Sequence, residues 1–254
     1  MIAHERHRLL LRRLEETGSI EFRGLGDELG VAAMTIWRDL RLLERQGLLR
    51  RVRGGAIRAD RAQEPEFRQK EGRALAEKRR IAAAAARLFA RPGDVILLEG
   101  GTTVAELLPH LPHRGLTVMT NSLPILSRAQ ALGRGWQIHC SGGVLSPVSG
   151  NFVGPEAVRF FQGKYAATFF MSATGLDPQS GALTDPNPVE IEVKRAMARA
   201  AQRVVLLLDS GKLGLRSVQQ VLPLRDIDTL LTDRAISPAD RRRIARHGPK
   251  VRIC

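Results

Sequence analysis

Residues 95–106 read VILLEGGTTVAE, and this stretch predicts how the larger part of the chain folds. Four apolar residues precede Glu99, two glycines and two threonines, and an amphipathic pattern begins immediately afterwards. This order is typical of a buried strand that turns through glycine into a helix, and such turns hold phosphate groups through their backbone N–H groups. The stretch therefore predicts an α/β domain with a candidate phosphate site.

The same alternation continues along the rest of the chain. Short apolar runs occupy residues 95–98, 116–120, 136–140, 168–173, 204–208 and 229–232, and helical patterns lie near 103–111, 123–132, 155–162 and 188–201. Short strands that alternate with helices are typical of a largely parallel sheet covered by helices on both faces. We therefore expect one such sheet in this part of the chain.

The segments that follow the predicted strands are all polar or rich in glycine. In parallel sheets, ligands bind beyond the carboxyl ends of the strands. Each segment taken alone is most simply an ordinary turn, but together they predict one pocket with small donors, carboxylates and a lysine. Glu99, Asn121, Ser122, Gly143, Asp177 and Lys212 come from these segments. Such groups suit a phosphorylated sugar or polyol better than a nucleotide.

Several other functions lack their sequence signatures. A Walker A motif is excluded, because Leu206 stands where its first glycine is required and Leu213 where serine or threonine is required. No GxGxxG follows a predicted strand, the six histidines show no metal-binding spacing, and Cys140 and Cys254 are the only cysteines. We therefore predict no cofactor and no metal.

Neither a membrane span nor a signal peptide is predicted. No apolar run approaches the roughly 18 residues of a membrane-spanning helix. The start, MIAHERHRLLLRR, is densely charged and lacks a small-residue cleavage site. We expect a cytoplasmic protein that makes no contact with the membrane.

The net charge of +14 is concentrated in the two ends of the chain. Residues 1–61 and 62–91 each carry +4 and residues 235–254 carry +5, whereas residues 92–234 carry only +1. A polyanion such as DNA would bind the basic flanks, because neutralisation of phosphates supplies much of the affinity for nucleic acids. A generally arginine-rich composition would give the same charge without that function.

The N-terminal segment predicts three short helices and a hairpin. Leu10, Leu11 and Leu14 recur at helical spacing before Gly18, and a second short helical element covers residues 22–29. A third helix follows the Gly30-Val31 turn, and LLRRVRGGAIR then alternates around Gly54-Gly55 as hairpins do. This order predicts a winged helix-turn-helix, mostly α-helical with a β wing.

The third helix is the candidate recognition helix. Ile36, Leu40 and Leu43 share its apolar face, whereas polar side chains occupy the other face, namely Thr35, Arg38, Arg41 and Arg45. In the major groove these arginines would bond guanine edges or phosphates, and Arg51 and Arg53 of the wing would add contacts to double-stranded DNA. The alternative is a small helical hairpin that binds protein.

Residues 30–56, GVAAMTIWRDLRLLERQGLLRRVRGGA, resemble the DNA-binding region of the DeoR family of bacterial transcriptional regulators. Ala32 departs from the family's serine, Trp37 from the first of two recognition-helix arginines, and Arg53 from the wing histidine. The resemblance implies DNA contacts by this helix, and the departures concern the base sequence that it reads. Trp37 is expected either to contact DNA or to turn inward, with a preference for packing in the core or at the domain edge.

The resemblance to the DeoR family continues through residue 233 in motifs such as EKRRIA, GDVILLEGGTT, LTVMTNSL, TGLDPQSGALT and VVLLLDSGKLG. It implies an effector domain that resembles ribose-5-phosphate isomerase and senses phosphorylated sugars. The positions that match the family's pocket are Gly100, Gly101, Thr102, Thr103, Thr120, Asn121, Gly142, Asp177, Lys194 and Lys212.

Four segments are expected in the chain. Residues 1–60 form the DNA-binding domain, 61–75 a linker or hinge, 76–235 the effector domain, and 236–254 a basic tail with a last helix and a short strand. A homodimer or homotetramer would place two winged helices on paired half-sites.

The pocket leaves three functions open. In the first, a repressor of a sugar or polyol catabolic operon is relieved by a phosphorylated sugar. In the second, the pocket is that of an isomerase; the related enzymes carry an acid where Thr174 stands, so Asp177 lacks its partner and no catalytic residue is assigned. In the third, the α/β domain of a DNA-binding protein serves only for assembly.

Overall fold

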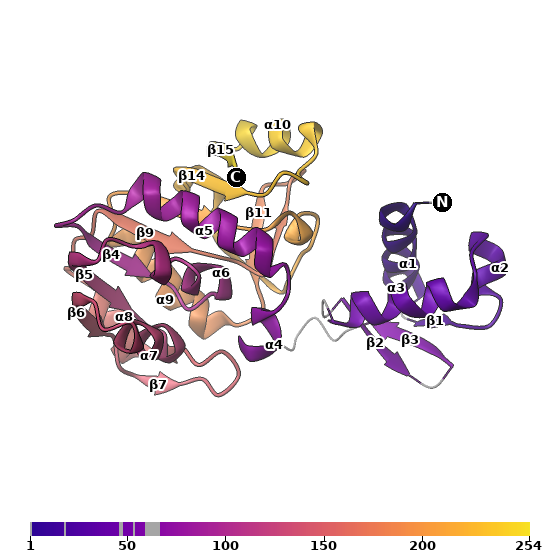
Figure 1. Cartoon of the computed structure of the whole chain (residues 1–254), viewed down its shortest axis with the longest axis horizontal. Coiled ribbons are helices and arrows are strands. Elements are labelled where there is room, and N and C mark those ends of the chain that lie inside the picture. Colours follow the sequence, from indigo (N-terminus) through magenta and orange to yellow (C-terminus); the bar gives the residue numbers. More distant parts are fainter. Residues whose placement is uncertain (1, 18, 46–47, 53, 59–66) are drawn as a thin grey trace. The chain divides into compact units, whose positions relative to one another are not determined.

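The computed structural model describes residues 2–17, 19–45, 48–52, 54–58 and 67–254. The chain divides into two compact units, Met1–Pro65 and Glu66–Cys254 (Figure 1). Arg53 and residues 61–66 of the predicted linker lie outside the described residues. Residues 67–71 of the predicted linker form a short helix.

The N-terminal unit has the predicted winged helix-turn-helix fold. Its elements are α1 (Ala3–Thr17), β1 (Ser19–Glu21), α2 (Leu25–Leu29), α3 (Ala33–Arg45), β2 (Leu49–Val52) and β3 (Gly55–Arg58). The hairpin β2–β3 is antiparallel as expected, and β1, which the sequence did not suggest, pairs with β3. Leu10 and Leu14 of α1 are buried with Ile36, Leu40 and Leu43 of α3, so the predicted apolar faces form one core.

Two glycines shape the turn of this motif. Gly30 ends α2 in the left-handed conformation, at φ 65°, which glycine adopts without strain. Gly26 lies inside α2, and a Cβ there would sit 2.8 Å from the carbonyl oxygen of Val31. Glycine at position 26 therefore lets the turn that follows α2 pass close to the helix. This close packing offsets the low helix propensity of glycine.

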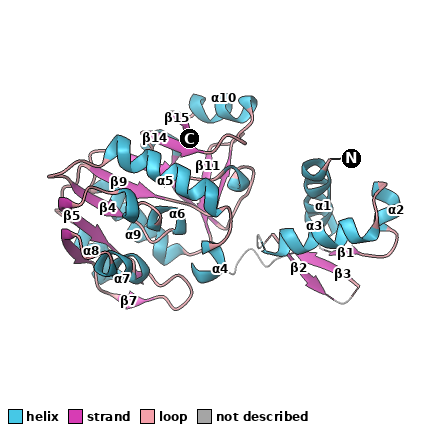
Figure 2. Cartoon of the chain, viewed as in Figure 1, coloured by secondary structure: helices cyan, strands magenta, loops and turns pink. Residues whose placement is uncertain are grey.

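The C-terminal unit is built on a seven-stranded sheet in which every neighbouring pair is parallel (Figure 2). Its strands are β4 (Val95–Leu98), β5 (Arg114–Thr120), β6 (Gly135–Cys140), β9 (Thr168–Met171), β12 (Val204–Leu207), β14 (Thr229–Thr232) and β15 (Lys250–Ile253). The strand order is β15-β14-β12-β9-β4-β5-β6. The chain therefore starts in the middle of the sheet at β4, builds toward β6, and then returns to β9 on the other side of β4.

Successive residues of each strand point into different cores. Ile96 and Leu98 lie in one core and Leu97 in the other, as expected of strands buried on both faces. The first core is covered by α5 (Leu75–Phe89), α6 (Thr102–Ala105) and α7 (Leu123–Ala131). The second is covered by α8 (Pro155–Phe161), α9 (Pro188–Arg199) and α10 (Pro238–Arg246).

Three features of this unit differ from the sequence-based expectation or go beyond it. The helix predicted near 103–111 is only the four-residue α6, followed by a short 3-10 turn at Leu108–His110. Two small antiparallel sheets were not predicted: β7 (Val144–Leu145) with β8 (Phe152–Val153), and β10 (Gly175–Asp177) with β11 (Ala182–Asp185) and β13 (Gln219–Pro223). The basic tail forms its expected helix and strand, and β15 is the seventh strand of the main sheet.

α4 (Phe67–Glu71) precedes α5 and packs on the same unit. The Phe67 N–H donates to the Val148 carbonyl oxygen at 3.1 Å, Phe67 is buried, and Glu71 pairs with Arg128. Among the described residues, no helix is both long and apolar enough to cross a membrane.

Candidate functional site

The recognition helix α3 presents a mixed face of arginine and apolar side chains to solvent. Met34, Trp37, Arg38, Arg41 and Leu42 are all exposed, while Thr35 is half-buried. The predicted alternation of core and outer residues is therefore observed for these positions. The Arg45 side chain and Arg53 lie outside the described part of the structure, so their predicted DNA contacts remain predictions.

Trp37 does not pack in the core, one of the two placements that the sequence favoured, and packing at the domain edge stays a prediction. Its side chain is 39% exposed. The guanidinium carbons of Arg41 and Arg51 lie 5.3 Å and 5.1 Å from its ring centroid, within the range of cation–π contacts. Arg51 belongs to the wing strand β2, so the ring contacts both the recognition helix and the wing.

A buried ion cluster fixes α3 against α1. Asp39 accepts a hydrogen bond from Arg6 Nε at 2.6 Å and lies 2.8 Å from His7 Nε2. Burial by itself raises the pKa of Asp39, but the hydrogen bonds from Arg6 and His7 outweigh it and hold the pKa below its ordinary value. Asp39 therefore has a structural role, because its ion pairs fix the orientation of α3 relative to α1.

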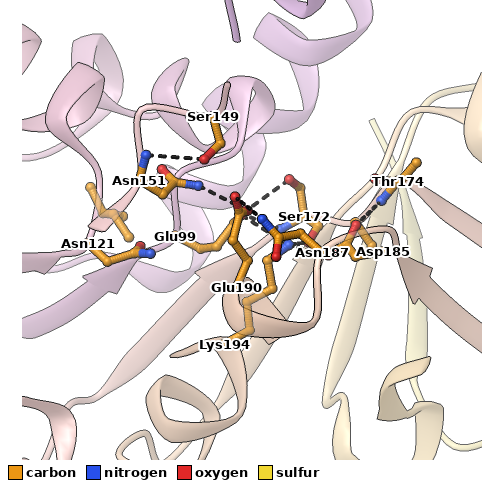
Figure 3. A network of polar contacts seen from close by, with 12 residues as sticks. Glu99, Asn121, Ser149, Asn151, Ser172, Thr174, Asp185, Asn187, Glu190 and Lys194 are labelled. Carbon is orange, nitrogen blue, oxygen red and sulfur yellow. Dashed lines mark hydrogen bonds and ion pairs between the residues drawn. The ribbon is translucent and has the colours of Figure 1, made fainter. Parts of the chain in front are cut away.

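The centre of the C-terminal unit is the point where its strand order reverses, between β4 and β9. In open parallel sheets, ligands bind beyond the carboxyl ends of the strands at this point. Glu99 follows β4 and Ser172 follows β9, and Ser172 donates to Glu99 Oε2 through its backbone N–H at 3.1 Å and its hydroxyl at 3.2 Å (Figure 3). The carboxylate of Glu99 is thus held by the neighbouring strand end and does not point freely into the pocket.

Lys194 of α9 lies beneath the same point. Its ammonium group pairs with Glu99 Oε1 at 3.1 Å and with Asp185, and donates to the Ser172 carbonyl oxygen at 3.1 Å (Figure 3). Burial disfavours its charge, yet Asp185 and Glu99 outweigh burial and raise the pKa of Lys194 above its ordinary value. Asp185 also accepts from the Thr174 N–H at 2.6 Å. Lys194 therefore forms ion pairs with two buried carboxylates, and these pairs stabilise the fold.

The paired glycines after β4 make room for side chains. Neither has a positive φ. A Cβ on Gly100 would lie 1.7 Å from Asn151 Oδ1, and one on Gly101 would lie 2.0 Å from Ser172 Oγ. Both positions require glycine because Asn151 and Ser172 approach the turn this closely.

Three side chains at this edge keep an unpaired buried oxygen in the described structure: Thr103 Oγ1, Asn121 Oδ1 and Asn151 Oδ1. All three residues are at most 2% exposed. The amide group of Asn121 donates to the Phe152 carbonyl at 3.2 Å, and that of Asn151 to Glu190 at 3.4 Å (Figure 3). Buried oxygens without a partner are costly, so a ligand that donates hydroxyl hydrogens would fit them.

Positive charge gathers at the same edge of the sheet. Lys212, which follows β12, donates to the Ala173 carbonyl oxygen at 2.8 Å, directly between Ser172 and Thr174. Lys78 of α5 is buried and donates to the Lys70 carbonyl oxygen. Burial, and then the neighbouring charge of Lys212, lower the pKa of Lys78 to about 8. We call Lys70, Arg73, Lys78 and Lys212 the cation cluster.

Asp209 is the acidic group whose charge acts on both Lys78 and Lys212. Burial lowers the pKa of Lys212 and that of Arg73 as well. The charges of Lys212, Lys70 and Arg73 lower the pKa of Lys78, and the charge of Lys70 lowers that of Lys212, while Asp209, Asp185 and Glu99 act on Lys212 in the opposite direction. A phosphate dianion would be attracted to this group of basic side chains. Ala74, beside Arg73, adopts the left-handed conformation at φ 48°, which costs a residue with a Cβ about 1 kcal/mol or more.

The structure brings most of the sequence-predicted effector residues to this edge, and several of them make hydrogen bonds within the fold. That they bind an effector stays a prediction. Thr120 donates to the Leu98 carbonyl and accepts from the Ser122 N–H, and Ser122 caps α7. Thr102 is buried in α6, whereas Gly142 and Gly143 adopt positive φ in the turn before β7. Asp177 lies in the small sheet, where Arg216, Ser180 and Gln179 bind its carboxylate.

The predicted phosphate site at the start of a helix stays a prediction, and the helix there, α6, has only four residues and provides no substantial helix dipole. The cation cluster lies at the same edge of the sheet, and only Lys212 of its four members was predicted as a site residue. Lys70, Arg73 and Lys78 precede the sheet in sequence, in segments read as linker and as an alanine-rich helix. Asn151, Asp185 and Glu190 were not predicted as site residues either, because they lie in a loop, in the short strand β11 and in α9, and the sequence does not reveal where these segments meet the sheet.

Two family models match the chain. The DeoR-like helix-turn-helix domain matches residues 6–62, and the DeoR C terminal sensor domain matches residues 73–234. The chain belongs to the DeoR family.

Similar proteins cover nearly the whole DeoR-family chain. The HTH-type transcriptional regulator GlpR of Haloferax volcanii is 33% identical over 99% of this chain and 98% of its own. A putative aga operon transcriptional repressor of Escherichia coli O157:H7 is 31% identical over 93% of this chain and 88% of its own. The lactose phosphotransferase system repressor of Staphylococcus epidermidis is 30% identical over 88% of this chain and 89% of its own. The present chain is accordingly a DNA-binding transcriptional regulator and not an enzyme.

Solved structures with part of this fold include ribose 5-phosphate isomerase from Plasmodium falciparum. It covers 54% of this chain and 52% of its own at 14% identity, with a TM-score of 0.38. The β subunit of eIF2B from Chaetomium thermophilum covers 60% of this chain and 47% of its own at 14% identity, with a TM-score of 0.43. At this level, shared folds host unrelated functions.

Proposed function

We propose that this regulator represses a sugar or polyol catabolic operon and is released from DNA by a phosphorylated sugar bound in its C-terminal unit. The observation that carries the proposal is the pairing of two features at one edge of the sheet. The cation cluster gathers four basic side chains, and Thr103, Asn121 and Asn151 offer buried oxygens without a hydrogen-bond partner in the described structure. A phosphate group with neighbouring hydroxyls has the complementary chemistry.

The ligand in this proposal carries its phosphate on Lys78 and Lys212 and its hydroxyls on the amide side. Lys212 lies between the phosphate side and the hydroxyl side of this site. It donates to the carbonyl oxygen of Ala173, and the preceding residue, Ser172, donates to Glu99. Glu99 is paired with Lys194, which weakens its repulsion of the phosphate.

The position of α4 offers a route from the ligand to the DNA-binding domain. α4 carries Lys70 of the cation cluster and follows the segment that joins the two units. Lys78 holds the Lys70 carbonyl, and the Val148 carbonyl holds the Phe67 N–H. An anion that draws Lys70, Lys78 and Lys212 together would shift α4, and a differential affinity of 1–3 kcal/mol between two states suffices for regulation.

The names of two relatives support the proposal that this regulator is a repressor of sugar catabolism. One is called a lactose phosphotransferase system repressor and another a putative aga operon repressor. We further propose that the protein acts in the cytoplasm as a homodimer or homotetramer on paired half-sites, because one winged helix covers only a short operator segment.

A thermal-shift screen tests the ligand class. The panel holds phosphorylated pentoses, hexoses and polyols, each beside its unphosphorylated counterpart at matched ionic strength. We expect at least one phosphorylated compound to stabilise the C-terminal unit and its counterpart to have no effect. The same compound should then release the protein from its own promoter DNA. Stabilisation without release would leave a binding site without a regulatory role, and no stabilisation by any compound would contradict the proposal.

A further inference from the structure

We propose that Trp37 reads a thymine in the operator, by packing the edge of its indole ring against the 5-methyl group in the major groove. Arg41 and Arg51 hold the ring in position for this contact. The inference depends on the DNA-binding domain alone, so it stands or falls separately from the proposed effector.

The placement of Trp37 is unusual for its size. Its helix α3 buries Ile36, Leu40 and Leu43 almost completely, yet Trp37 stays 39% exposed on the face that carries Arg38 and Arg41. A large aromatic ring exposed among arginines is characteristic of binding surfaces rather than of unused surface. In a winged helix-turn-helix this face of the recognition helix meets the bases.

The ring is held in position from two elements. Arg41 lies one helical turn further along α3, and Arg51 reaches it from the wing strand β2. Arg51 is itself fixed by Glu44, whose carboxylate accepts from Arg51 Nε at 2.6 Å and from the Arg51 N–H at 2.9 Å. The rotamer of Trp37 is thus set before DNA binds, which lowers the entropy cost of a contact through this ring.

The chemistry of the ring favours thymine. Indole has one N–H donor and no acceptor, so it cannot form the paired bonds by which arginine selects guanine. In the major groove, the apolar feature that distinguishes one base from the others is the thymine methyl, which aromatic and small apolar side chains contact. Arg38 and Arg41 remain available for guanine edges or phosphates on either side.

A purely structural role is the competing explanation. In that case Trp37 would only join the wing to the recognition helix, and its loss would weaken binding to every sequence alike. Replacement of thymine by uracil in DNA separates the two roles, because it removes a single methyl group and leaves the hydrogen-bonding groups of the base pair unchanged.

The experiment uses the full-length protein and duplexes that it selects from a random pool. Each thymine of the selected site is replaced in turn by uracil, and dissociation constants are measured for the natural protein, Trp37→Ala, Trp37→Phe and the control Leu42→Ala. Leu42 serves as the control because it is also an exposed apolar residue of α3. We expect one uracil position per half-site to weaken the natural protein about fourfold, the factor that corresponds to about 0.8 kcal/mol for one buried methyl group.

That penalty should persist in Leu42→Ala, shrink in Trp37→Phe and vanish in Trp37→Ala. Trp37→Arg, which restores the residue of the family pattern, should select guanine at the same position. The proposal is overturned if every uracil substitution is neutral for the natural protein. It is also overturned if Trp37→Ala loses as much affinity as the natural protein when uracil replaces thymine at the sensitive position.

Discussion

Each unit of this regulator contains a buried cluster of charged side chains, and the two clusters have opposite states of completion. In the DNA-binding unit, the carboxylate of Asp39 is paired with both Arg6 and His7. In the sensor unit, Lys194 is paired with Glu99 and Asp185, and beside them lie the cation cluster and the buried oxygens of Thr103, Asn121 and Asn151, which lack a hydrogen-bond partner in the described structure. We call the first cluster completed and the second incomplete, and we propose that the incomplete one is the place of a ligand.

Removal of Lys194 should have the largest effect of the changes considered. Lys194→Met leaves Glu99 and Asp185 buried without their cation, and we expect the free energy of unfolding of the sensor unit to fall by about 3–5 kcal/mol. The measurement is urea unfolding followed by Trp136 fluorescence in a Trp37→Phe background, since the chain has only two tryptophans.

Lys212→Met is the matched comparison for Lys194→Met. It removes one basic side chain of the cation cluster, where neighbouring cations repel one another. We therefore expect the free energy of unfolding to fall by no more than about 1 kcal/mol, from the lost hydrogen bond to the Ala173 carbonyl. Equal losses for the two lysines would contradict the distinction between completed and incomplete clusters.

Asp39→Ala tests the completed cluster of the DNA-binding unit. It leaves the buried guanidinium of Arg6 without its carboxylate, and we expect the unit to lose about 2–3 kcal/mol, measured by Trp37 fluorescence in a Trp136→Phe background. Glu28→Ala breaks the exposed pair with Arg13 and should cost less than about 1 kcal/mol. A cost for Asp39→Ala as small as that of Glu28→Ala would show that the cluster does not hold α3.

The incomplete cluster should also give the sensor unit a distinctive pH dependence. The pKa of Lys78 is about 8 in the folded chain and 10.5 for a free lysine, so the folded chain binds fewer protons between these values. Its free energy of unfolding should therefore rise with pH from 8 to 10, by an amount on the order of 3 kcal/mol in buffers without multivalent anions.

Lys78→Met should reduce this rise, leaving the part that Lys212 contributes through its own lowered pKa, and inorganic phosphate should reduce it by keeping Lys78 charged. Identical slopes for Lys78→Met and the natural protein would contradict the assignment.

The strained residue beside the cation cluster gives the smallest expected effect. Ala74→Gly relieves a left-handed conformation at φ 48°, and we expect the sensor unit to gain up to about 1 kcal/mol. Ala76→Gly, in the exposed part of α5, should lose a similar amount and serves as the control. A loss for Ala74→Gly as well would show that the conformation at position 74 is not strained.

Much of the fold could be predicted from the sequence, because hydrophobic period and turn residues determine it locally. The apolar faces of α1 and α3, the wing hairpin and most of the parallel strands follow from such patterns. β1, β10, β11 and β13 could not be predicted in this way, since short strands draw their stability from partners distant in sequence.

The site was only partly predictable for a related reason. Residues that directly follow strands, such as Glu99, Asn121 and Lys212, are brought together by sheet topology. The role of Lys194 depends on which buried carboxylates a helix meets, and Lys70 and Lys78 join the site from helices packed beside the sheet. The exposure of Trp37 depends on two arginines, one of them in another element.

The account is tested most directly by release from DNA. Promoter DNA bound to the natural protein, to Lys78→Met and to Lys212→Met is titrated with the phosphorylated sugar that stabilises the natural protein. We expect the three proteins to bind DNA with equal affinity, and the sugar phosphate to release the natural protein while concentrations at least tenfold higher are needed for either variant. Release of both variants at the same concentration as the natural protein would contradict the claim that the cation cluster senses the phosphate.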